Sequence, residues 1–262
     1  MYEKVKKYQG NLLFPSNTFT VIAGPCAVED EETMMKTALF LKSLGINYLR
    51  AGAYKPRTSP YTFQGLEKQG LELLKNVKEK TKIKIVTEIV DSKDITLYQE
   101  IVDIIQVGAR NMQNFSLLKA LGKINKPILL KRSFGATIEE WLYACEYLFN
   151  EGNEQIILCE RGIKTFETMT RNTLDISSVP LIKGISKIPV FVDPSHSSGR
   201  SDIIIPLAKA ALAVGADGLM VEVHPKPECS LSDKDETINF ADFKRLISEI
   251  TVIAQAMNIT II

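Results

Sequence analysis

The sequence has little of what several protein classes require. It contains no run of about 18 apolar residues, the length that a transmembrane helix needs. Its 32 Lys and Arg residues are balanced by 31 Asp and Glu residues, which leaves a net charge of +1. A broad surface for nucleic acid or for an anionic membrane is therefore not expected. The four cysteines form no CxxC pair and no disulfide framework.

The beginning of the chain, MYEKVKKYQGN, lacks the apolar stretch of a secretory signal. Together with cysteines that show no pairing pattern, this predicts a cytoplasmic protein with reduced thiols. Apolar residues make up 45% and charged residues 24% of the 262 residues, a composition typical of a globular protein. A chain of this length buries roughly 70–75% of its unfolded surface and needs no disulfides to hold its core.

Short apolar, β-branched runs alternate with longer segments of helical periodicity. We expect strands at residues 19–25, 48–54, 83–90, 101–107, 127–131, 155–159, 189–193 and 218–223, each followed by a helix. The fourth helix is expected at residues 115–121, the sixth helix around 174–183 and the last helix at 240–257. Thr137 and Glu140 predict a capping box at the start of the fifth helix. This alternation is typical of parallel βαβ units.

Eight such units form a barrel of about 250 residues, which is nearly the whole chain. The expected fold is therefore α/β, a single (β/α)8 TIM barrel at residues 19–262, with a short N-terminal extension at 1–18. An open, doubly wound sheet is the alternative. Its first strand usually precedes a glycine-rich dinucleotide turn, and GPCAVE is not one.

In such a barrel the active site lies at the carboxyl ends of the strands. Each predicted strand ends near a residue that can bind a metal, hold an anion or move a proton. In chain order these are Cys26, Arg50 with Lys55, Glu88, Arg110, Lys131, Arg161, His196 and Glu222. One charge at a strand end is as often without function as with it, but a complete set indicates a site.

Cations form the first group of this set: Arg50, Lys55, Arg110, Lys131 and Arg161, with Arg57 just beyond. Two such charges ~8 Å apart repel by ~2 kcal/mol at an effective dielectric of ~20. Pairing with Glu88 or Asp193 relieves part of this repulsion. The group therefore predicts an anionic ligand with more than one phosphate or carboxylate. A turn at Gly108 offers backbone N–H groups for a phosphate.

The second group combines a thiol, an imidazole and carboxylates: Cys26, His196, Glu222 and an acid from the loop after the eighth strand. Such donors suit a divalent transition metal, and strands one, seven and eight adjoin in a closed barrel. Taken alone, Cys26 is more often a small buried hydrophobe. The residues leave the fourth ligand open among Glu228, Asp233 and Asp235. His224 competes with His196, which we prefer because it directly follows the seventh strand.

Several segments resemble, in order, the motifs of the short branch of the type I 3-deoxy-D-arabino-heptulosonate 7-phosphate (DAHP) synthases. They are GPCAVE, RAGAYKPRTSPYTFQGLE, TEIVD, QVGARNMQNF, LLKRSFGAT, ILCERG, FVDPSHSSGR and VEVHPKPECSLSD. The resemblance implies a transferase of the shikimate pathway, for aromatic amino acid biosynthesis. Phosphoenolpyruvate, erythrose 4-phosphate and water would give DAHP and phosphate. It also implies one divalent metal ion (Mn, Fe, Zn, Co or similar) and a homodimer or homotetramer.

The resemblance also assigns roles to residues. The implied metal ligands are Cys26, His196, Glu222 and Asp233, with Asp233 chosen over Asp235. Phosphoenolpyruvate binding falls to Arg50, Lys55, Glu88, Ala109, Arg110, Lys131 and Arg161. Erythrose 4-phosphate binding falls to Lys55, Pro56, Arg57, Thr58, Ser59 and Asp193. The implied catalytic residues are Lys55, Cys26 and His196. Lys55 is expected to transfer a proton at the aldehyde oxygen, because neighbouring cations make its ammonium group a better acid.

Three alternatives stay open. The sister enzyme, 3-deoxy-manno-octulosonate 8-phosphate synthase, takes arabinose 5-phosphate and resembles this chain in its barrel and its metal ligands. The segment KPRTS favours the four-carbon sugar instead. A synthase that uses both sugars is a variant of this alternative. A Schiff-base aldolase with Lys131 as nucleophile leaves the metal-type donors unexplained. A sugar-phosphate binder without catalysis leaves the ligand set unused. The N-terminal segment is too short for a regulatory domain, so we expect no feedback inhibition by aromatic amino acids.

Overall fold

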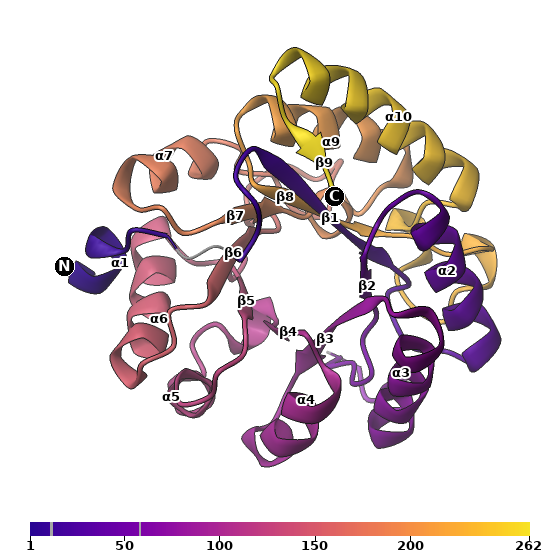
Figure 1. Cartoon of the computed structure of the whole chain (residues 1–262), viewed down its shortest axis with the longest axis horizontal. Coiled ribbons are helices and arrows are strands. Elements are labelled where there is room, and N and C mark those ends of the chain that lie inside the picture. Colours follow the sequence, from indigo (N-terminus) through magenta and orange to yellow (C-terminus); the bar gives the residue numbers. More distant parts are fainter. Residues whose placement is uncertain (11–12, 58) are drawn as a thin grey trace.

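The computed structural model describes residues 1–10, 13–57 and 59–262. Within this part of the chain, eight parallel strands close into a barrel, because β1 pairs with both β8 and β2. The strands are β1 Thr18–Gly24, β2 Tyr48–Arg50, β3 Lys84–Ile89, β4 Ile104–Val107, β5 Ile128–Lys131, β6 Ile156–Glu160, β7 Val190–Val192 and β8 Gly218–Glu222. Figure 1, which looks down the barrel, shows the helices as an outer ring. The predicted (β/α)8 fold is confirmed.

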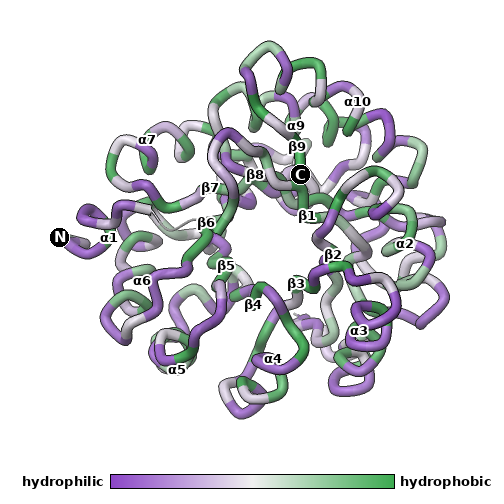
Figure 2. Tube along the Cα trace, in the orientation of Figure 1, coloured by the Kyte–Doolittle hydropathy of each residue, from purple (hydrophilic) through white to green (hydrophobic). Residues whose placement is uncertain are grey.

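The outer helices follow the strands in turn. They are α2 Glu31–Ser43, α3 Glu67–Thr81, α4 Ile95–Ile101, α5 Phe115–Gly122, α6 Ile138–Glu151, α7 Ser178–Ile185, α9 Ile204–Ala213 and α10 Phe240–Ala256. Thr137 and Glu140 form the predicted capping box at the start of α6. Figure 2 shows hydrophobic residues along β4, β5 and β6 and mixed colours on the surrounding helices, as amphipathic helices require. Among the described residues, no helix is both long and apolar enough to cross a membrane.

Some boundaries differ from the sequence prediction. β2 ends at Arg50 instead of residue 54, because the chain leaves the sheet there and Tyr54 pairs with Gly65 in a loop. β4 begins at Ile104, since α4 extends to Ile101. α7 begins at residue 178 and not 174, because an antiparallel bridge between Ile163 and Thr173 closes a long loop before it. The short elements α8 Pro194–Ser198 and β9 Thr260–Ile261 were not expected.

The N-terminal extension packs against the barrel. Its helix α1, Glu3–Lys7, is fixed by Val5, whose N–H donates to Glu146 Oε1 at 2.9 Å and whose carbonyl accepts from Ser186 at 2.7 Å. Farther along, the ring of Phe14 lies 5.3 Å from that of Phe191 and 6.1 Å from that of Tyr48. The Val5 contacts hold α1 against the outer ring of helices, whereas Phe14 packs against the apolar residues at the amino-terminal end of the barrel interior.

The inward-facing residues form an apolar layer and, one pleat farther, a polar layer. The apolar layer includes Ile22, Tyr48, Val86, Ile104, Leu129, Ile157, Phe191 and Met220. Because side chains alternate along a strand, the residue two positions farther faces the same interior. Those positions hold Gly24, Arg50, Glu88, Gln106, Lys131, Asp193 and Glu222, together with Cys159, which packs with the apolar layer. The strand periodicity therefore places the polar side chains together above an apolar floor.

Candidate active site

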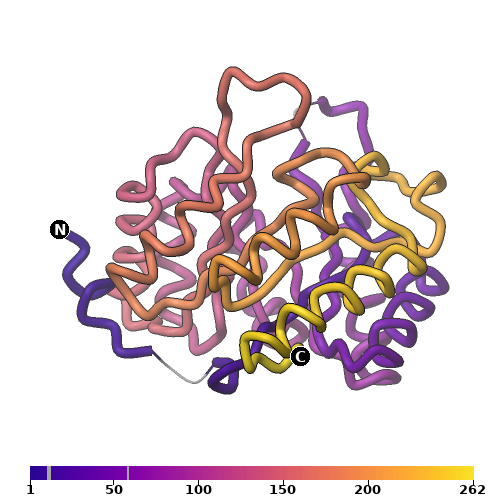
Figure 3. Tube along the Cα trace, turned by 90° about the horizontal axis from the view of Figure 1, so that it is seen from above, coloured from indigo at the N-terminus to yellow at the C-terminus, as the bar shows by residue number. Residues whose placement is uncertain are grey.

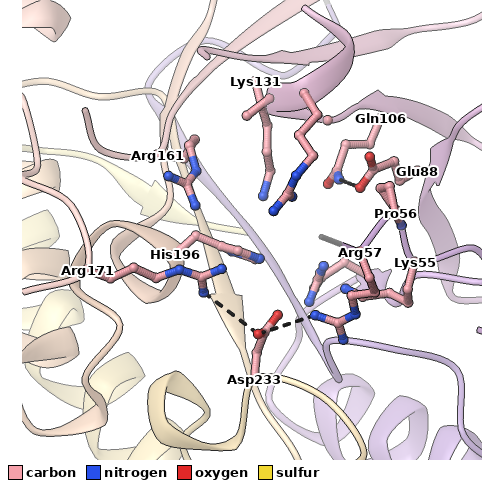
Figure 4. A pocket seen from close by; sticks show the side chains of 14 residues that line it. Lys55, Pro56, Arg57, Glu88, Gln106, Lys131, Arg161, Arg171, His196 and Asp233 are labelled. Atoms are coloured by element: carbon pink, nitrogen blue, oxygen red, sulfur yellow. Dashed lines mark hydrogen bonds and ion pairs between the residues drawn. The ribbon is translucent and has the colours of Figure 1, made fainter. Parts of the chain in front are cut away.

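A pocket at the carboxyl ends of the strands collects most of the expected site residues (Figure 4). Among the described residues, seven cations line it: Arg50, Lys55, Arg57, Arg110, Lys131, Arg161 and Arg171. The carboxylates of Glu88 and Asp233 and the ring of His196 lie between them. This excess of positive charge in a nearly neutral protein is suited to polyanionic small molecules.

Four donor groups gather at the base of this pocket. Cys26 follows β1, His196 lies in α8, Glu222 ends β8 and Asp233 lies in the loop after β8. One ligand atom of each lies within 4.8 Å of all the others. Cys26 Sγ is 2.9 Å from Asp233 Oδ2, and His196 Nε2 is 3.3 Å from Glu222 Oε1.

The donor set fits a divalent transition metal. Glu222 Oε2 is buried and has no hydrogen-bond partner among the described residues. A buried carboxylate oxygen without a partner is costly, and a cation at this position would remove the cost. Thiolate, imidazole and carboxylate are the ligands that zinc and its neighbours in the transition series bind.

The electrostatics of these groups agree with that chemistry. Burial lowers the pKa of His196, which keeps its imidazole neutral. Burial, reinforced by the charge of Glu222, raises the pKa of Cys26 to about 12, so a metal must displace a proton from this thiol. Burial would raise the pKa of Asp233, but the charge of Lys55 and the hydrogen bond from Cys26 outweigh it and hold that pKa well below its usual range.

Asp193 connects the donor group with the cations. Its Oδ2 lies 2.5 Å from Lys131 Nζ and 2.8 Å from His196 Nδ1. This carboxylate is fully buried behind the ring and is not among the residues that line the pocket. A carboxylate behind a ligating histidine orients the ring, which here turns Nε2 toward Glu222. The structure thus places Asp193 against Lys131 and His196, and its contact with erythrose 4-phosphate stays a prediction.

Other cations touch the donor group directly. Arg50 Nη1 donates to Glu222 Oε1 at 2.6 Å and to the carbonyl of Pro25 at 3.0 Å. Lys55 Nζ donates to Cys26 Sγ at 2.8 Å and to the carbonyl of Cys26 at 3.1 Å. The expected anion-binding residues and the expected metal ligands thus form one continuous site.

Glu88 on β3 and Arg110 in the turn after β4 meet at the pocket. Gln106 donates to Glu88 Oε2 at 3.1 Å. A Cβ on Gly108 would lie 2.0 Å from Glu88 Oε1, so only glycine lets this carboxylate pack against the turn. Ala109 and Arg110 follow and line the pocket.

The loop after β2 holds the expected sugar-phosphate residues. Pro56 and Arg57 line the pocket, and Arg57 also contacts Ser232 and the Oδ1 atom of Asp233. Ser59 does not line the pocket; its hydroxyl accepts from the N–H of Tyr61 at 3.4 Å. Thr58 lies outside the described residues. Figure 3 shows this loop and the loop between β6 and α7 rising beyond the same end of the barrel.

The competing candidates of the β8 loop lie elsewhere. His224 Nε2 is 3.3 Å from Glu29 Oε2, and its Nδ1 accepts from the N–H of Lys226 at 3.0 Å. It therefore braces the loop that carries Asp233. Glu228 and Asp235 are not members of the donor group.

Sequence reasoning missed two residues of the pocket. Gln106 lies on β4 and faces the interior of the barrel, and the two-residue period of the strand could have identified it. Arg171 lies within the loop between β6 and α7, where no periodicity indicates which side chains turn inward. Only its contacts in the folded protein reveal it.

Comparison with known proteins places the chain among characterised relatives. Residues 10–256 match the family model described as the DAHP synthetase I family. A phospho-2-dehydro-3-deoxyheptonate aldolase of Thermotoga maritima is 54% identical over 252 residues, which span 96% of this chain and 75% of that protein. A 2-dehydro-3-deoxyphosphooctonate aldolase of Francisella philomiragia is 31% identical over 252 residues, 88% of this chain and 89% of that protein.

Solved structures give the same picture. The crystal structure of the Thermotoga maritima DAHP synthase has a TM-score of 0.92 at 53% identity and covers 97% of this chain and 75% of that one. A truncated form of 3-deoxy-D-arabino-heptulosonate 7-phosphate synthase from the same organism has a TM-score of 0.89 at 51% identity, covering 97% and 93%. The resemblance in sequence motifs therefore extends to the whole barrel.

Proposed function

The chain belongs to the DAHP synthetase I family and catalyses the DAHP synthase reaction, and from this premise we propose how its residues divide the work. Cys26, His196, Glu222 and Asp233 would hold one divalent metal ion, and the cations above them would hold phosphoenolpyruvate and erythrose 4-phosphate. One observation carries this proposal: the four donor atoms lie within 4.8 Å of one another, and two of their residues, His196 and Asp233, line the pocket that also holds the seven cations.

The reaction joins two polyanions. Carbon 3 of phosphoenolpyruvate attacks the aldehyde carbon of the sugar, and water adds to carbon 2. The bond between carbon 2 and the former enol oxygen then breaks, and inorganic phosphate leaves with that oxygen. A divalent metal supplies Lewis acidity for the aldehyde or for the water. Lys131, Arg161 and Arg110 neutralise the carboxylate and phosphate of phosphoenolpyruvate, and the turn at Ala109 carries backbone N–H groups next to them.

Lys55 is placed for proton transfer. Its Nζ lies on the pocket surface, 2.8 Å from Cys26 Sγ. When the aldehyde carbon is attacked, its oxygen gains negative charge and needs a proton. An ammonium next to the donor group can supply that proton as a general acid.

Arg57 is the expected phosphate contact of the sugar. An Arg57→Gln variant should raise the KM for erythrose 4-phosphate roughly ten- to hundredfold, because a charge-assisted hydrogen bond is worth about 1.5–3 kcal/mol. The KM for phosphoenolpyruvate should stay near that of the wild type. Arg245→Gln, on the exposed face of α10, is the matched control. Equal changes in both KM values would contradict this role.

The proposal is tested by turnover. Phosphoenolpyruvate consumption is measured with erythrose 4-phosphate and, in parallel, with arabinose 5-phosphate, each with added Mn²⁺ and with EDTA. We expect metal-dependent consumption with the four-carbon sugar and little with the five-carbon sugar. Undiminished turnover after complete removal of metal would overturn the metal role. Inactivation by borohydride in the presence of substrate would favour a Schiff base at Lys131. In the structure Lys131 forms an ion pair with Asp193, which favours its charged form over a nucleophilic amine.

We further propose a cytoplasmic homodimer or homotetramer whose catalytic domain spans residues 19–262. The family resemblance supports the oligomer, which light scattering of the purified chain would test. Mn, Fe, Zn and Co all suit the donor set. Absence of feedback inhibition stays a prediction.

A further inference from the structure

Arg171 reaches the active site through a loop that is bonded to the helix of His196. The loop lies between β6 and α7 and is closed by the bridge between Ile163 and Thr173. The N–H of Arg171 donates to the carbonyl of Ser198 at 2.9 Å. The neighbouring Asn172 donates from its backbone to Ser197 at 2.9 Å and from its side chain to the carbonyl of His196 at 3.0 Å.

These bonds fix the base of the Arg171 side chain relative to α8. Loops usually hold side chains less firmly than strands do, since few backbone groups in them are paired. Here the backbone of two consecutive residues is paired with the element that carries a metal ligand. The backbone of Arg171 is therefore held by the helix that carries His196.

The guanidinium of Arg171 faces two carboxylates. Its Nη1 forms an ion pair with Glu236 and lies 3.7 Å from Asp233 Oδ1. Glu236 is 5% exposed, so this partner is held in the interior, where burial and the charge of Glu222 raise its pKa to about 8. Figure 4 shows Arg171 and Arg57 on opposite sides of Asp233, each joined to it by a dashed line.

The two oxygens of Asp233 thus have different surroundings. Oδ1 is approached by Arg57 at 3.6 Å and by Arg171 at 3.7 Å, whereas Oδ2 lies 2.9 Å from Cys26 Sγ. Cations that approach one oxygen of a carboxylate favour the orientation in which its other oxygen faces a metal. Asp233 needs such partners, because it lies in a loop and not on a strand.

The two arginines differ in what else they are free to do. Arg57 lies in the loop proposed to receive the sugar phosphate, and a phosphate dianion would compete with Asp233 for its guanidinium. Arg171 is paired with Glu236, and its backbone is anchored to α8, so its guanidinium is held closer to Asp233 than to the loop of the sugar phosphate. A substrate that drew Arg57 away would leave Arg171 as the cation next to Asp233 Oδ1.

We propose that Arg171 is a positioning residue for Asp233, which keeps Oδ2 directed toward the metal while Arg57 serves the sugar phosphate. This inference rests on the proposed metal site. It adds a residue from the loop between β6 and α7, which contributes none of the expected metal ligands.

The test measures metal affinity in the absence of substrates. Metal-free wild type, Arg171→Gln, Arg171→Lys and the control Arg245→Gln are titrated with Mn²⁺ against a chromophoric chelator. Loss of a group that orients a ligand typically weakens metal binding by about 10–100-fold. We expect Arg171→Gln to fall in this range, Arg171→Lys to recover part of the loss, and Arg245→Gln to bind like the wild type.

A double variant tests the division of labour. Arg57→Gln alone should weaken Mn²⁺ binding only slightly, because Arg171 remains. The variant with both arginines replaced should lose more affinity than the product of the two single effects, since each arginine substitutes in part for the other. Strictly multiplicative losses would overturn the shared hold on Asp233.

Wild-type Mn²⁺ affinity in folded Arg171→Gln would overturn the proposal. Arg171→Met, which keeps the apolar stem, decides the question in the same way if the glutamine variant does not fold. A loss of phosphoenolpyruvate affinity and thermal stability without a loss of Mn²⁺ affinity would mean a structural role, and would also overturn it. Cys26→Ser separates the two levels of inference: if it binds Mn²⁺ like the wild type, the proposed metal site itself is wrong.

Discussion

Replacing Cys26 by serine is expected to abolish metal retention and turnover. Cys26 is fully buried, and its Sγ lies within reach of His196, Glu222 and Asp233. A serine hydroxyl does not ionise at neutral pH, so the site loses its thiolate. Because this removes a ligand itself, metal affinity should fall by more than the ~100-fold that marks the upper range for groups behind a ligand. Metal content after dialysis, together with phosphoenolpyruvate consumption, measures both losses.

The protonation state of the Cys26 thiol predicts how metal binding depends on pH. Burial raises the pKa of Cys26 to about 12, so the metal-free thiol is protonated at neutral pH and must release its proton to the solvent when metal binds. The pKa of His196 is lowered, and its imidazole releases none. Affinity should therefore rise about tenfold per pH unit between about pH 7 and 9 and fall as the pH decreases.

Calorimetry in buffers of different ionisation enthalpy counts the released protons. We expect about one proton per metal ion in the wild type, by the balance above. Cys26→Ser should lose this release along with its affinity. An affinity that does not change with pH in the wild type would contradict the assignment of Cys26 as a ligand.

Replacing Arg132 by methionine is expected to have the largest effect on stability. Its Nη1 lies 2.8 Å from Glu160 Oε2 and 2.7 Å from Asp175 Oδ2, and its Nε donates to the carbonyl of Ala136 at 3.0 Å. The Glu160 side chain is 0% exposed. Breaking a buried ion pair by removing one partner leaves an unpaired buried charge, which costs about 3–5 kcal/mol. Urea unfolding at pH 7 measures this loss.

The pH dependence of the variant identifies the cause. Burial raises the pKa of Glu160 even when Arg132 is present, and loss of the guanidinium raises it further. A carboxyl with a raised folded-state pKa stabilises the fold most below its unfolded pKa, and this stability is lost as the pH rises through the folded pKa. The destabilisation by Arg132→Met should therefore diminish toward pH 4.

Two further variants control this prediction. The double variant Arg132→Met with Glu160→Gln should recover part of the stability, because it removes the fully buried charge and leaves only that of the more exposed Asp175 without its arginine. Arg200→Met removes an exposed pair with Asp202 and should cost less than about 1 kcal/mol. A loss below about 1 kcal/mol in Arg132→Met would show that the buried pair contributes little.

The sequence predicts this fold well because strand periodicity and barrel closure act together. Arg50, Glu88, Lys131 and Glu222 each lie at the end of a strand, so their convergence follows from the eight parallel strands alone. Their inward direction follows from the two-residue period of a strand.

Loop residues were less predictable, for a physical reason. Arg171 is positioned by backbone hydrogen bonds to α8, and such long-range pairing leaves no periodic signal. Asp233 could be chosen over Asp235 only through the family motif. Asp193 lies at a strand end as expected, but ion pairs with Lys131 and His196 turn it behind the ring and away from the pocket.

This sharing of Asp193 makes the two halves of the site thermodynamically dependent on each other. One carboxylate faces both a lysine of the anion pocket and an imidazole of the donor group. An anion that draws Lys131 toward itself leaves more of the negative charge of Asp193 to His196, which makes the imidazole a stronger donor. Thermodynamic reciprocity then requires two equal effects: if the anion raises the affinity for the metal by some factor, the metal raises the affinity for the anion by the same factor.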